Sequence, residues 1–146
     1  MKILRFVLVC LIYSALSTAN AQWVHVGLEN FYVEALVVSP NDASGNTLFA
    51  GTNGNGVFIS TNNGIDWTQV NTGLNNIYVK VLAISDTNIF AVTGIGIYRS
   101  TNNGASWILL KTTDSAVESF AIAPSEQGEK NLFALTTQNI YHSTNN

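Results

Sequence analysis

Two copies of one eight-residue stretch decide the fold of this chain. They read Ser-Thr-Asn-Asn-Gly-Ile-Asp-Trp at 60–67 and Ser-Thr-Asn-Asn-Gly-Ala-Ser-Trp at 100–107, and we call each stretch a box. A third box begins as Ser-Thr-Asn-Asn at 143–146, so the box serines are spaced 40 and then 43 residues apart. Similarity at a nearly fixed period of this length indicates a repeat protein.

The similarity extends to short apolar segments, three before each box and one after it. β-Branched and aromatic residues between Gly- and Asn-rich turns predict strands in each segment. The sequence therefore predicts an all-β fold. The expected strands are 33–38, 48–50, 57–59 and 67–70, then 79–84, 89–91, 97–99 and 107–110, then 117–122, 132–134 and 140–142, with 23–26 as a further copy of the strand that follows a box.

A four-stranded antiparallel unit of about 40 residues has the size of a β-propeller blade. The first two strands of each unit are nearly continuous apolar runs, which is typical of strands covered on both faces. We therefore expect residues 22–146 to form an incomplete β-propeller, with repeats at 33–70, 79–110 and 117–146.

Three blades are fewer than the four to eight that usually close a ring. We expect the terminal blades to expose apolar faces and strand edges, and self-association through them. Two interpretations remain. The favoured one is that the chain is a fragment that stops inside the third box. The alternative is a six-bladed dimer in which the strand at 23–26 completes the last blade.

Each box has the composition of a hairpin turn between the third and fourth strands. The asparagines can accept hydrogen bonds from nearby backbone N–H groups, the glycines supply backbone freedom, and each tryptophan buries a large apolar area. We interpret the box as a turn that stabilises the fold, with a calcium or sugar site as the alternative. The turn residues are Ser60, Asn62, Gly64, Trp67, Ser100, Asn102, Gly104, Trp107, Ser143 and Asn145.

A second turn is expected four residues before each box serine, where Gly56, Gly96 and Asn139 stand. These residue types tolerate a positive φ, which tight hairpins require.

The pattern Ser-x-Asn-x-Gly-x-x-Trp resembles the Asp-box, or bacterial neuraminidase repeat, whose third position is usually Asp. In that family it occurs in sialidases, sortilin-type receptors, photosystem II assembly-factor-like proteins and xyloglucanase-like hydrolases. The resemblance covers nearly the whole chain after residue 21 and implies a β-propeller. The chain looks most similar to exported bacterial proteins of the sortilin-like or photosystem II assembly-factor-like kind.

Residues 1–21 have the pattern of a secretory signal peptide. Lys2 and Arg5 precede an apolar run, and Ala19-Asn20-Ala21 fits a cleavage site. The run is too short to span a bilayer comfortably, so we expect no membrane span after cleavage and a secreted, periplasmic or cell-surface location. The only cysteine, Cys10, lies in this segment, so disulfides and cysteine metal sites are not expected afterwards.

Composition narrows the functional classes further. Only 10% of the residues are charged, and four basic residues face nine acidic ones after residue 21. A nucleic-acid binder that works through a basic surface is therefore excluded. We expect no cofactor, because the two histidines lack metal-ligand spacing and the Gly51-x-x-Gly54-x-Gly56 segment opens no helix.

The sequence leans against an enzyme. A sialidase resembling this family needs three arginines, whereas Arg99 is the only arginine after residue 21. Glycoside hydrolases need two carboxylates across the sugar. Glu34 and Glu118 occupy matching positions with Lys80 between them in the series. We interpret these three residues as a polar channel lining, and a propeller glycoside hydrolase, sialidase- or xyloglucanase-like, is the alternative.

The favoured function is a non-catalytic binding or scaffold module for a protein or a glycan. In an antiparallel meander, the loops joining the second and third strands share one side with the loops that join consecutive blades. Asn and Tyr side chains on that side suit protein or glycan contacts. The candidate ligand residues are Tyr32, Asn53, Asn55, Asn75, Asn76, Tyr78 and Asp114.

Overall fold

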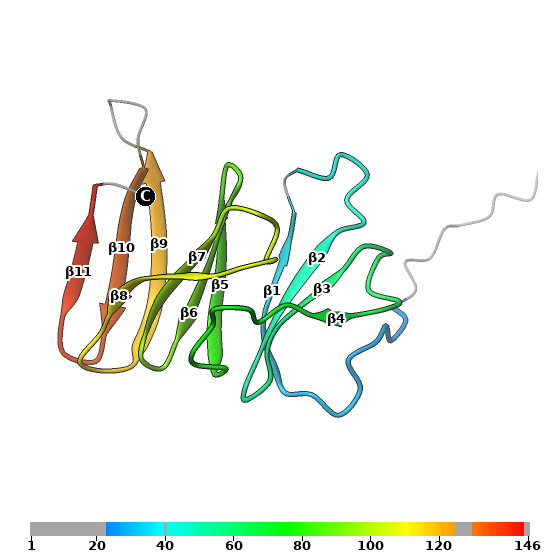
Figure 1. Cartoon of the computed structure of the whole chain (residues 1–146), viewed down its shortest axis with the longest axis horizontal. Helices are drawn as coiled ribbons and strands as arrows, with labels where there is room; N and C mark the ends of the chain where they lie inside the picture. Colours follow the sequence, from blue (N-terminus) through cyan, green and yellow to red (C-terminus); the bar gives the residue numbers. More distant parts are fainter. Residues whose placement is uncertain (1–22, 40, 125–129, 145–146) are drawn as a thin grey trace, which may run out of the picture.

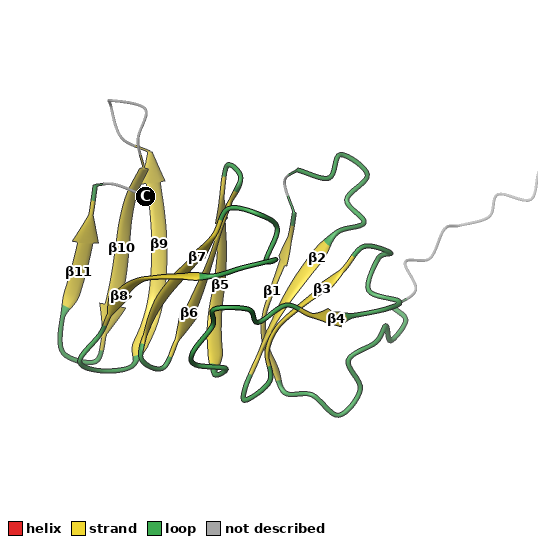
Figure 2. Cartoon of the chain, viewed as in Figure 1, coloured by secondary structure: helices red, strands yellow, loops and turns green. Residues whose placement is uncertain are grey.

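The computed structural model describes residues 23–39, 41–124 and 130–144. Within these residues the chain consists of strands and loops, with no helix (Figure 2). The expected signal peptide at 1–21 and the third-box residue Asn145 lie outside the described part. In the same part of the chain, no helix has the length and hydropathy needed to cross a membrane.

The strands form three antiparallel sheets, each a meander of neighbours in sequence. Because every strand pairs only with the one before or after it, each sheet is a local unit. The first sheet contains β1 (Val33–Val38), β2 (Leu48–Thr52), β3 (Gly56–Ser60) and β4 (Thr68–Gln69); the second contains β5 (Val79–Ser85), β6 (Asn88–Thr93), β7 (Gly96–Ser100) and β8 (Ile108–Thr112); the third contains β9 (Val117–Pro124), β10 (Lys130–Thr136) and β11 (Ile140–Ser143).

The three sheets stand side by side in the order of the sequence (Figure 1). β1 and β2 of the first sheet lie against β5, and β5 and β6 of the second lie against β9. Each sheet therefore packs face to face on the next. The chain is a partial β-propeller, as the repeats predict.

The registers repeat between sheets. Leu82 of β5 is opposite Ala91 of β6, which is opposite Tyr98 of β7, and Phe120, Ala134 and Tyr141 make the same chain of pairs in the third sheet. Positions that are equivalent in the sequence repeat are therefore equivalent in space.

Two local expectations differ from the structure. Residues 23–26 are not in a strand, because they form no strand pairing with any other described residue. Of the three glycine or asparagine turn positions, only Gly56 has a positive φ, at 80°. Gly96 is needed instead for close approach, since a Cβ there would lie 2.5 Å from the carbonyl oxygen of Lys111.

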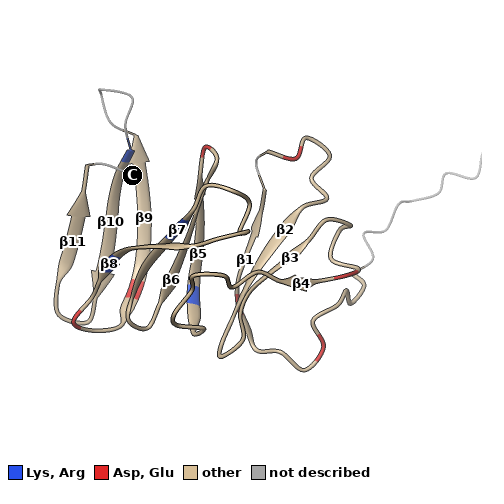
Figure 3. Cartoon of the chain, viewed as in Figure 1, with Lys and Arg blue, Asp and Glu red and all other residues tan. Residues whose placement is uncertain are grey.

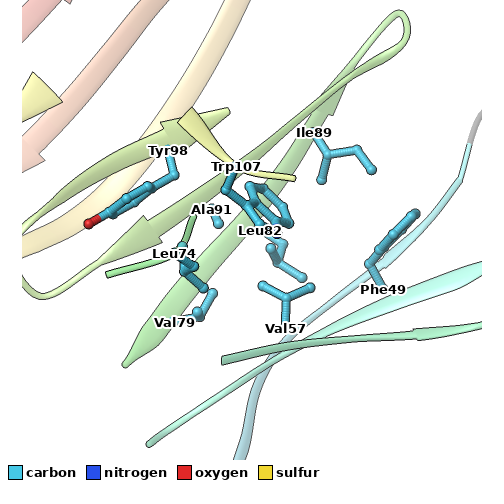
Figure 4. Close-up of a cluster of buried hydrophobic side chains, with 9 residues drawn as sticks. All are labelled: Phe49, Val57, Leu74, Val79, Leu82, Ile89, Ala91, Tyr98 and Trp107. Carbon is cyan, nitrogen blue, oxygen red and sulfur yellow. The ribbon is translucent and has the colours of Figure 1, made fainter. Parts of the chain in front are cut away.

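The core between the first and second sheets is apolar and closely packed (Figure 4). Phe49 and Val57 come from the first sheet and are fully buried. Trp107 lies between the two sheets and packs into this cluster. The second sheet and the loop before it contribute Leu74, Val79, Leu82, Ile89, Ala91 and Tyr98.

A second cluster joins the second and third sheets through equivalent positions. Phe90, Val92 and Ile97 come from the second sheet, and Val117, Leu132 and Ala134 from the third. We call the face of a sheet that packs on the following sheet its leading face; on the second sheet this face carries Phe90, Val92 and Ile97. The face that packs on the preceding sheet is the trailing face; on the third sheet it carries Val117, Leu132 and Ala134. Leading faces pack on the trailing face of the next sheet.

The two outermost faces are uncovered. Phe133, Leu135 and Ile140 occupy leading-face positions of the third sheet and are exposed, whereas their equivalents Phe90, Val92 and Ile97 are buried. On the trailing face of the first sheet, Leu36 is 61% exposed, whereas its equivalent Leu82 is 6% exposed. Both ends of the stack therefore present the apolar surfaces that the repeats predict.

Charged residues are sparse and scattered over strands and loops (Figure 3). Lys80 of β5 forms an ion pair with Glu118 of β9, and Lys130 lies 3.9 Å from the carboxylate of Asp86. Surface ion pairs of this kind contribute about 0–1 kcal/mol. Burial of apolar surface between sheets is therefore the main stabilising contribution.

The two box tryptophans provide a matched test of this packing. Trp107→Ala should lower the free energy of unfolding by about 3–5 kcal/mol, the range for truncating a large core side chain. Trp67→Ala should cost less, because Trp67 is half-buried and, among the described residues, no sheet precedes the first one. Urea unfolding followed by circular dichroism measures both. Equal losses in the two variants would contradict the assignment of Trp107 to an inter-sheet core.

Candidate functional site: the box turns and the loop face

The first box is a closed hydrogen-bonded turn between β3 and β4. The Ser60 hydroxyl donates to Oδ1 of Asn62 at 3.0 Å and accepts from the backbone N–H of Gly64 at 2.9 Å. Oδ1 of Asn62 also accepts from the backbone N–H of Asp66 at 2.9 Å. Asn63 and Gly64 have φ of 59° and 84°, a left-handed pair that favours asparagine and glycine.

The second box repeats this geometry between β7 and β8. The hydroxyl of Ser100 lies 2.9 Å from Oδ1 of Asn102 and accepts from the N–H of Gly104 at 2.9 Å. Oδ1 of Asn102 accepts from the N–H of Ser106 at 2.9 Å. Both turns bond within themselves through the residues that the sequence singles out. This arrangement supports a structural role for the box. In the third box, Ser143 ends β11.

The boxes differ in the partner of the asparagine side-chain N–H. Nδ2 of Asn62 donates to the carboxylate of Asp66 at 2.8 Å, whereas Nδ2 of Asn102 lies 2.8 Å from the hydroxyl of Ser106. The amide nitrogen is needed in the first box because a carboxylate can only accept. An aspartate at position 62 would place two acceptors together.

The boxes also differ in the indole partner. Nε1 of Trp67 donates to the carbonyl of Gly64 in its own box at 2.7 Å. Nε1 of Trp107 donates to the carbonyl of Val70, in the first repeat, also at 2.7 Å. Trp107 therefore links two blades.

The opposite side of the molecule carries the candidate ligand residues, and we call it the loop face. It consists of the β2–β3, β6–β7 and β10–β11 turns and of the segments before β1, β5 and β9. Backbone pairing between Asn53 and Tyr78 joins the β2–β3 turn to the segment before β5, and the N–H groups of Gly54 and Gly56 both donate to the carbonyl of Ile77. The loop face is therefore held together across blades.

Two tyrosines protrude from the loop face. Tyr32 is 81% exposed and Tyr78 is 58% exposed. Tyr78 borders a cavity of about 270 Å³ that is also lined by Glu34, Asn53, Val79, Lys80 and Gly94. The side-chain amide of Asn53 donates to the carboxylate of Glu34 at 3.3 Å. The cavity therefore combines an aromatic wall with one acidic and one basic group.

The predicted channel lining of Glu34, Lys80 and Glu118 is brought together in pairs. Lys80 forms the ion pair with Glu118, while Glu34 shares the cavity with Lys80. Among the described residues, no group of three side chains is arranged to hold a metal ion.

The other candidate asparagines have different surroundings. The carbonyl of Asn55 accepts from the side-chain amides of Gln69 and Asn71, and Oδ1 of Asn76 accepts from the N–H of Tyr78. These two residues therefore also shape their own turns. Asn75 is exposed on the same side.

Asp114 is engaged by the third sheet. Its carboxylate accepts from the hydroxyl of Tyr141 at 2.7 Å and from the side-chain amide of Asn139 at 3.3 Å. The hydrogen bond from Tyr141 lowers the pKa of Asp114, and the same bond raises the pKa of Tyr141. Asp114 thus ties the segment before β9 to β11.

A threonine stabilises each of the turns between β2 and β3, β6 and β7, and β10 and β11. This role was not predicted from the sequence. Thr52, Thr93 and Thr136 each donate a hydroxyl hydrogen bond to a turn carbonyl, at 2.8, 3.0 and 3.1 Å. All three are buried. The signal was present in the sequence, because the threonines recur with nearly the period of the boxes.

The sheets, their stacking and the repeated turn define the protein as a member of the β-propeller class. A family model for the DUF6242 beta propeller domain matches residues 10–120. The chain belongs to that family.

Solved structures show the same fold. The chain is similar to an ancestral GH74 enzyme, with 29% identity and a TM-score of 0.60 over 72% of this chain and 13% of that one. It is also similar to YCF48 from Cyanidioschyzon merolae, with 15% identity and a TM-score of 0.64 over 82% and 36% of the two chains. A structure of YCF48 bound to D1 peptide matches with 14% identity and a TM-score of 0.51 over 84% and 44%.

This chain therefore spans less than half the length of each of these proteins. No match was found among curated proteins.

The asparagine at the third box position can be tested by a matched pair of substitutions. Asn62→Asp should lower the free energy of unfolding at pH 7 by about 1 kcal/mol, because it places a carboxylate beside that of Asp66. Repulsion raises the pKa of the pair in the folded state. The loss should therefore be absent below a pH of about 3.9 and develop as the pH rises through the raised pKa. Urea unfolding at several pH values measures it.

Asn102→Asp is the matched control, because the hydroxyl of Ser106 can donate to the new carboxylate. Its effect should stay within about 0.5 kcal/mol at every pH. A second variant, Asn62→Asp with Asp66→Ser, should recover the stability. If Asn102→Asp were as damaging as Asn62→Asp, repulsion between carboxylates would not be the cause.

The link between Asp114 and Tyr141 predicts a pH effect. Tyr141→Phe should return the pKa of Asp114 toward its ordinary value, as measured by NMR titration of the carboxyl carbon. A lowered folded-state pKa contributes stability above the ordinary pKa, and this contribution is lost as the pH falls through the lowered value. The stability difference between wild type and Tyr141→Phe should therefore shrink below pH ~3.9.

Tyr98→Phe is the control for this prediction. Tyr98 occupies the equivalent position in the second sheet, and its buried hydroxyl makes no hydrogen bond to any described residue. The substitution should leave the pKa of Asp114 unchanged. An unchanged titration of Asp114 in Tyr141→Phe would show that the tyrosine does not set its pKa.

Proposed function

We propose that this protein is a non-catalytic binding or scaffold module whose loop face contacts a protein or a glycan. The observation that carries the proposal is the pair of exposed tyrosines on the loop face. Tyr78 lines the cavity together with Glu34, Asn53 and Lys80, and the carbonyl of Tyr32 accepts from the backbone N–H of Asn53 at 2.9 Å. Tyrosine offers a large rigid surface with a polar end, and asparagine offers adaptable hydrogen bonding, a combination found in recognition surfaces.

The arrangement of the loop face supports this role. Backbone bonds between the β2–β3 turn and the segment before β5 hold Tyr78 in place, so binding would order few additional residues. A preorganised surface loses less conformational entropy on binding. The similarity to YCF48 supports a propeller as a peptide-binding scaffold, since that protein is described as bound to D1 peptide.

The sequence supports a narrower group within the β-propellers and a location for the protein. The pattern of the boxes supports membership of the Asp-box group, with similarity to sortilin-like and photosystem II assembly-factor-like proteins. The pattern of residues 1–21 supports export by a signal peptide, with cleavage after Ala21 and a secreted, periplasmic or cell-surface location.

A glycoside hydrolase is the second candidate. The 29% identity to an ancestral GH74 enzyme favours it. Glu34 and Glu118 would have to supply the acid and the second carboxylate. Each already has a partner in this chain, because Glu118 pairs with Lys80 and Glu34 accepts from Asn53. These contacts favour the binding module over the hydrolase.

The decisive experiment compares wild type with Tyr32→Ala/Tyr78→Ala on a glycan array and a peptide display library. We expect wild type to retain ligands from one of these two classes, and the double variant to bind them at least tenfold more weakly. Ile65→Ala is the matched control, because Ile65 is an exposed apolar side chain in the first box, on the other side of the sheets. Its binding should equal that of wild type.

Two results would overturn the proposal. Hydrolysis of any member of a polysaccharide panel that is lost in Glu34→Gln or Glu118→Gln would establish the hydrolase instead. Equal binding by wild type and the double tyrosine variant would remove the loop face as the recognition surface.

A further inference from the structure

The cavity that Tyr78 borders on the loop face is built by the first two blades alone. It has a volume of about 270 Å³ and is lined by Glu34, Asn53, Tyr78, Val79, Lys80 and Gly94. This volume is below the ~300–1,000 Å³ of sites that hold drug-sized molecules. The cavity therefore suits a single side chain or a group of that size.

Tyr78 forms the aromatic wall of the cavity and is held in place by its backbone. Its N–H donates to Oδ1 of Asn76 at 3.0 Å, and it pairs with Asn53 of the neighbouring blade. Its ring lies against the backbone of Gly54, because a Cβ added there would be 3.9 Å from Cζ and 4.0 Å from Cε1 of the ring. Since Tyr78 is still 58% exposed, the ring is a fixed surface that a ligand can reach.

Glu34 gives the cavity a negative charge that no described cation balances. Among the described residues, its carboxylate accepts from the neutral side-chain amide of Asn53 at 3.3 Å and forms no ion pair. Lys80 also lines the cavity, but its ammonium group is paired with the carboxylate of Glu118. The three charged groups together therefore leave one negative charge in excess.

The charge of the rest of the chain acts in the same direction. Four basic residues face nine acidic ones after residue 21. An excess of negative charge raises the local concentration of cations and their rate of association, and it repels anions. A cationic ligand is therefore favoured over an anionic one, such as an acidic or phosphorylated segment.

An aromatic ring beside an unbalanced carboxylate is a combination that binds ammonium and guanidinium groups. The face of the ring attracts the cation electrostatically, and the carboxylate accepts charge-assisted hydrogen bonds from it. A sugar also stacks on an aromatic ring, but its hydroxyl groups carry no charge that would balance Glu34. The charges of the cavity thus distinguish between the two ligand classes considered for the loop face.

We infer that the cavity receives one basic side chain, arginine or lysine, of a partner protein, an assignment that rests on the proposed function. The cationic group lies between the ring of Tyr78 and the carboxylate of Glu34. Lys80 keeps its ion pair with Glu118. Arginine is favoured over lysine, because a planar guanidinium stacks on an aromatic ring and forms two parallel hydrogen bonds to a carboxylate.

The experiment uses the full chain and a capped peptide in which one arginine is flanked by glycines. Saturation-transfer difference NMR, with the peptide in large excess, measures the affinity. We expect a Kd of about 1–10 mM, because few non-hydrogen atoms enter the cavity. Citrulline in place of arginine keeps the shape and removes the charge, and it should weaken binding at least fivefold. A peptide with lysine should bind with an affinity between these two.

Substitutions of the cavity residues should change the affinity in opposite directions. Glu34→Gln and Tyr78→Ala should each weaken binding of the arginine peptide at least fivefold. Lys80→Gln should strengthen it about threefold, because the change removes a competing cation and leaves the carboxylate of Glu118 unbalanced. Damage to the fold would only weaken binding, so a gain in Lys80→Gln isolates the electrostatic cause.

Asp86→Asn is the matched control. It removes the same unit of negative charge from the β5–β6 turn, at the other end of the strands from the loop face. Asparagine suits the positive φ of 53° at this position. The affinity of this variant for the arginine peptide should equal that of wild type, and circular dichroism checks that every variant keeps its fold.

Three results would each overturn the assignment of a basic side chain. They are absence of binding by the arginine peptide, equal affinity for the arginine and citrulline peptides, and equal affinity of wild type and Glu34→Gln for the arginine peptide. A glycan that binds through Tyr32 and Tyr78 and is not displaced by the arginine peptide would also overturn it, while the loop face would stand as the recognition surface. Equal ligand binding by wild type and Tyr32→Ala/Tyr78→Ala would instead remove the proposed function itself.

Discussion

The structure depends on the burial of one sheet face against the next, with a tryptophan placed between them. A single meander of four strands leaves both faces apolar, because its first two strands carry apolar residues on both sides. Phe49 and Val57 are fully buried only because the second sheet and Trp107 cover them. The hydrogen bond from Trp107 to Val70 fixes the indole in that position. The box, the strands and the stacking thus serve one constraint, which is that each blade needs a neighbour.

Much of the fold could be predicted because the sequence repeats itself. A fixed period, apolar strands and the Ser-x-Asn-x-Gly-x-x-Trp pattern predicted all eleven strands of the described residues and one further strand, at 23–26, that the structure lacks. They also predicted the hydrogen-bonding role of Ser60 and Asn62. The repeat did not reveal which groups meet between blades. The capture of Asp114 by Tyr141 depends on how the loop before β9 passes the end of β11, and no local spacing encodes that contact. The indole N–H groups of Trp67 and Trp107 have different acceptors. The difference depends on whether a preceding sheet packs against the tryptophan, as the first sheet does against Trp107.

The loop face and the sheet faces differ in composition and in the contacts they make. The sheet faces are apolar and serve assembly, while the loop face carries tyrosines, asparagines and a few charges held by backbone bonds between blades. The exposed tyrosines Tyr32 and Tyr78 lie outside the two apolar clusters between the sheets. A scaffold whose fold is held by its sheets can carry different loops without a change of fold.

The pairing of each strand only with its sequence neighbours has a kinetic consequence. Contacts within a sheet are local, so a blade can begin to form as soon as its own segment is available, and its hairpins need little loop closure. Protection against opening comes from the adjoining blades instead. The middle sheet, covered on both faces, is then the slowest to exchange its amide hydrogens with solvent, and the first and third sheets open before it.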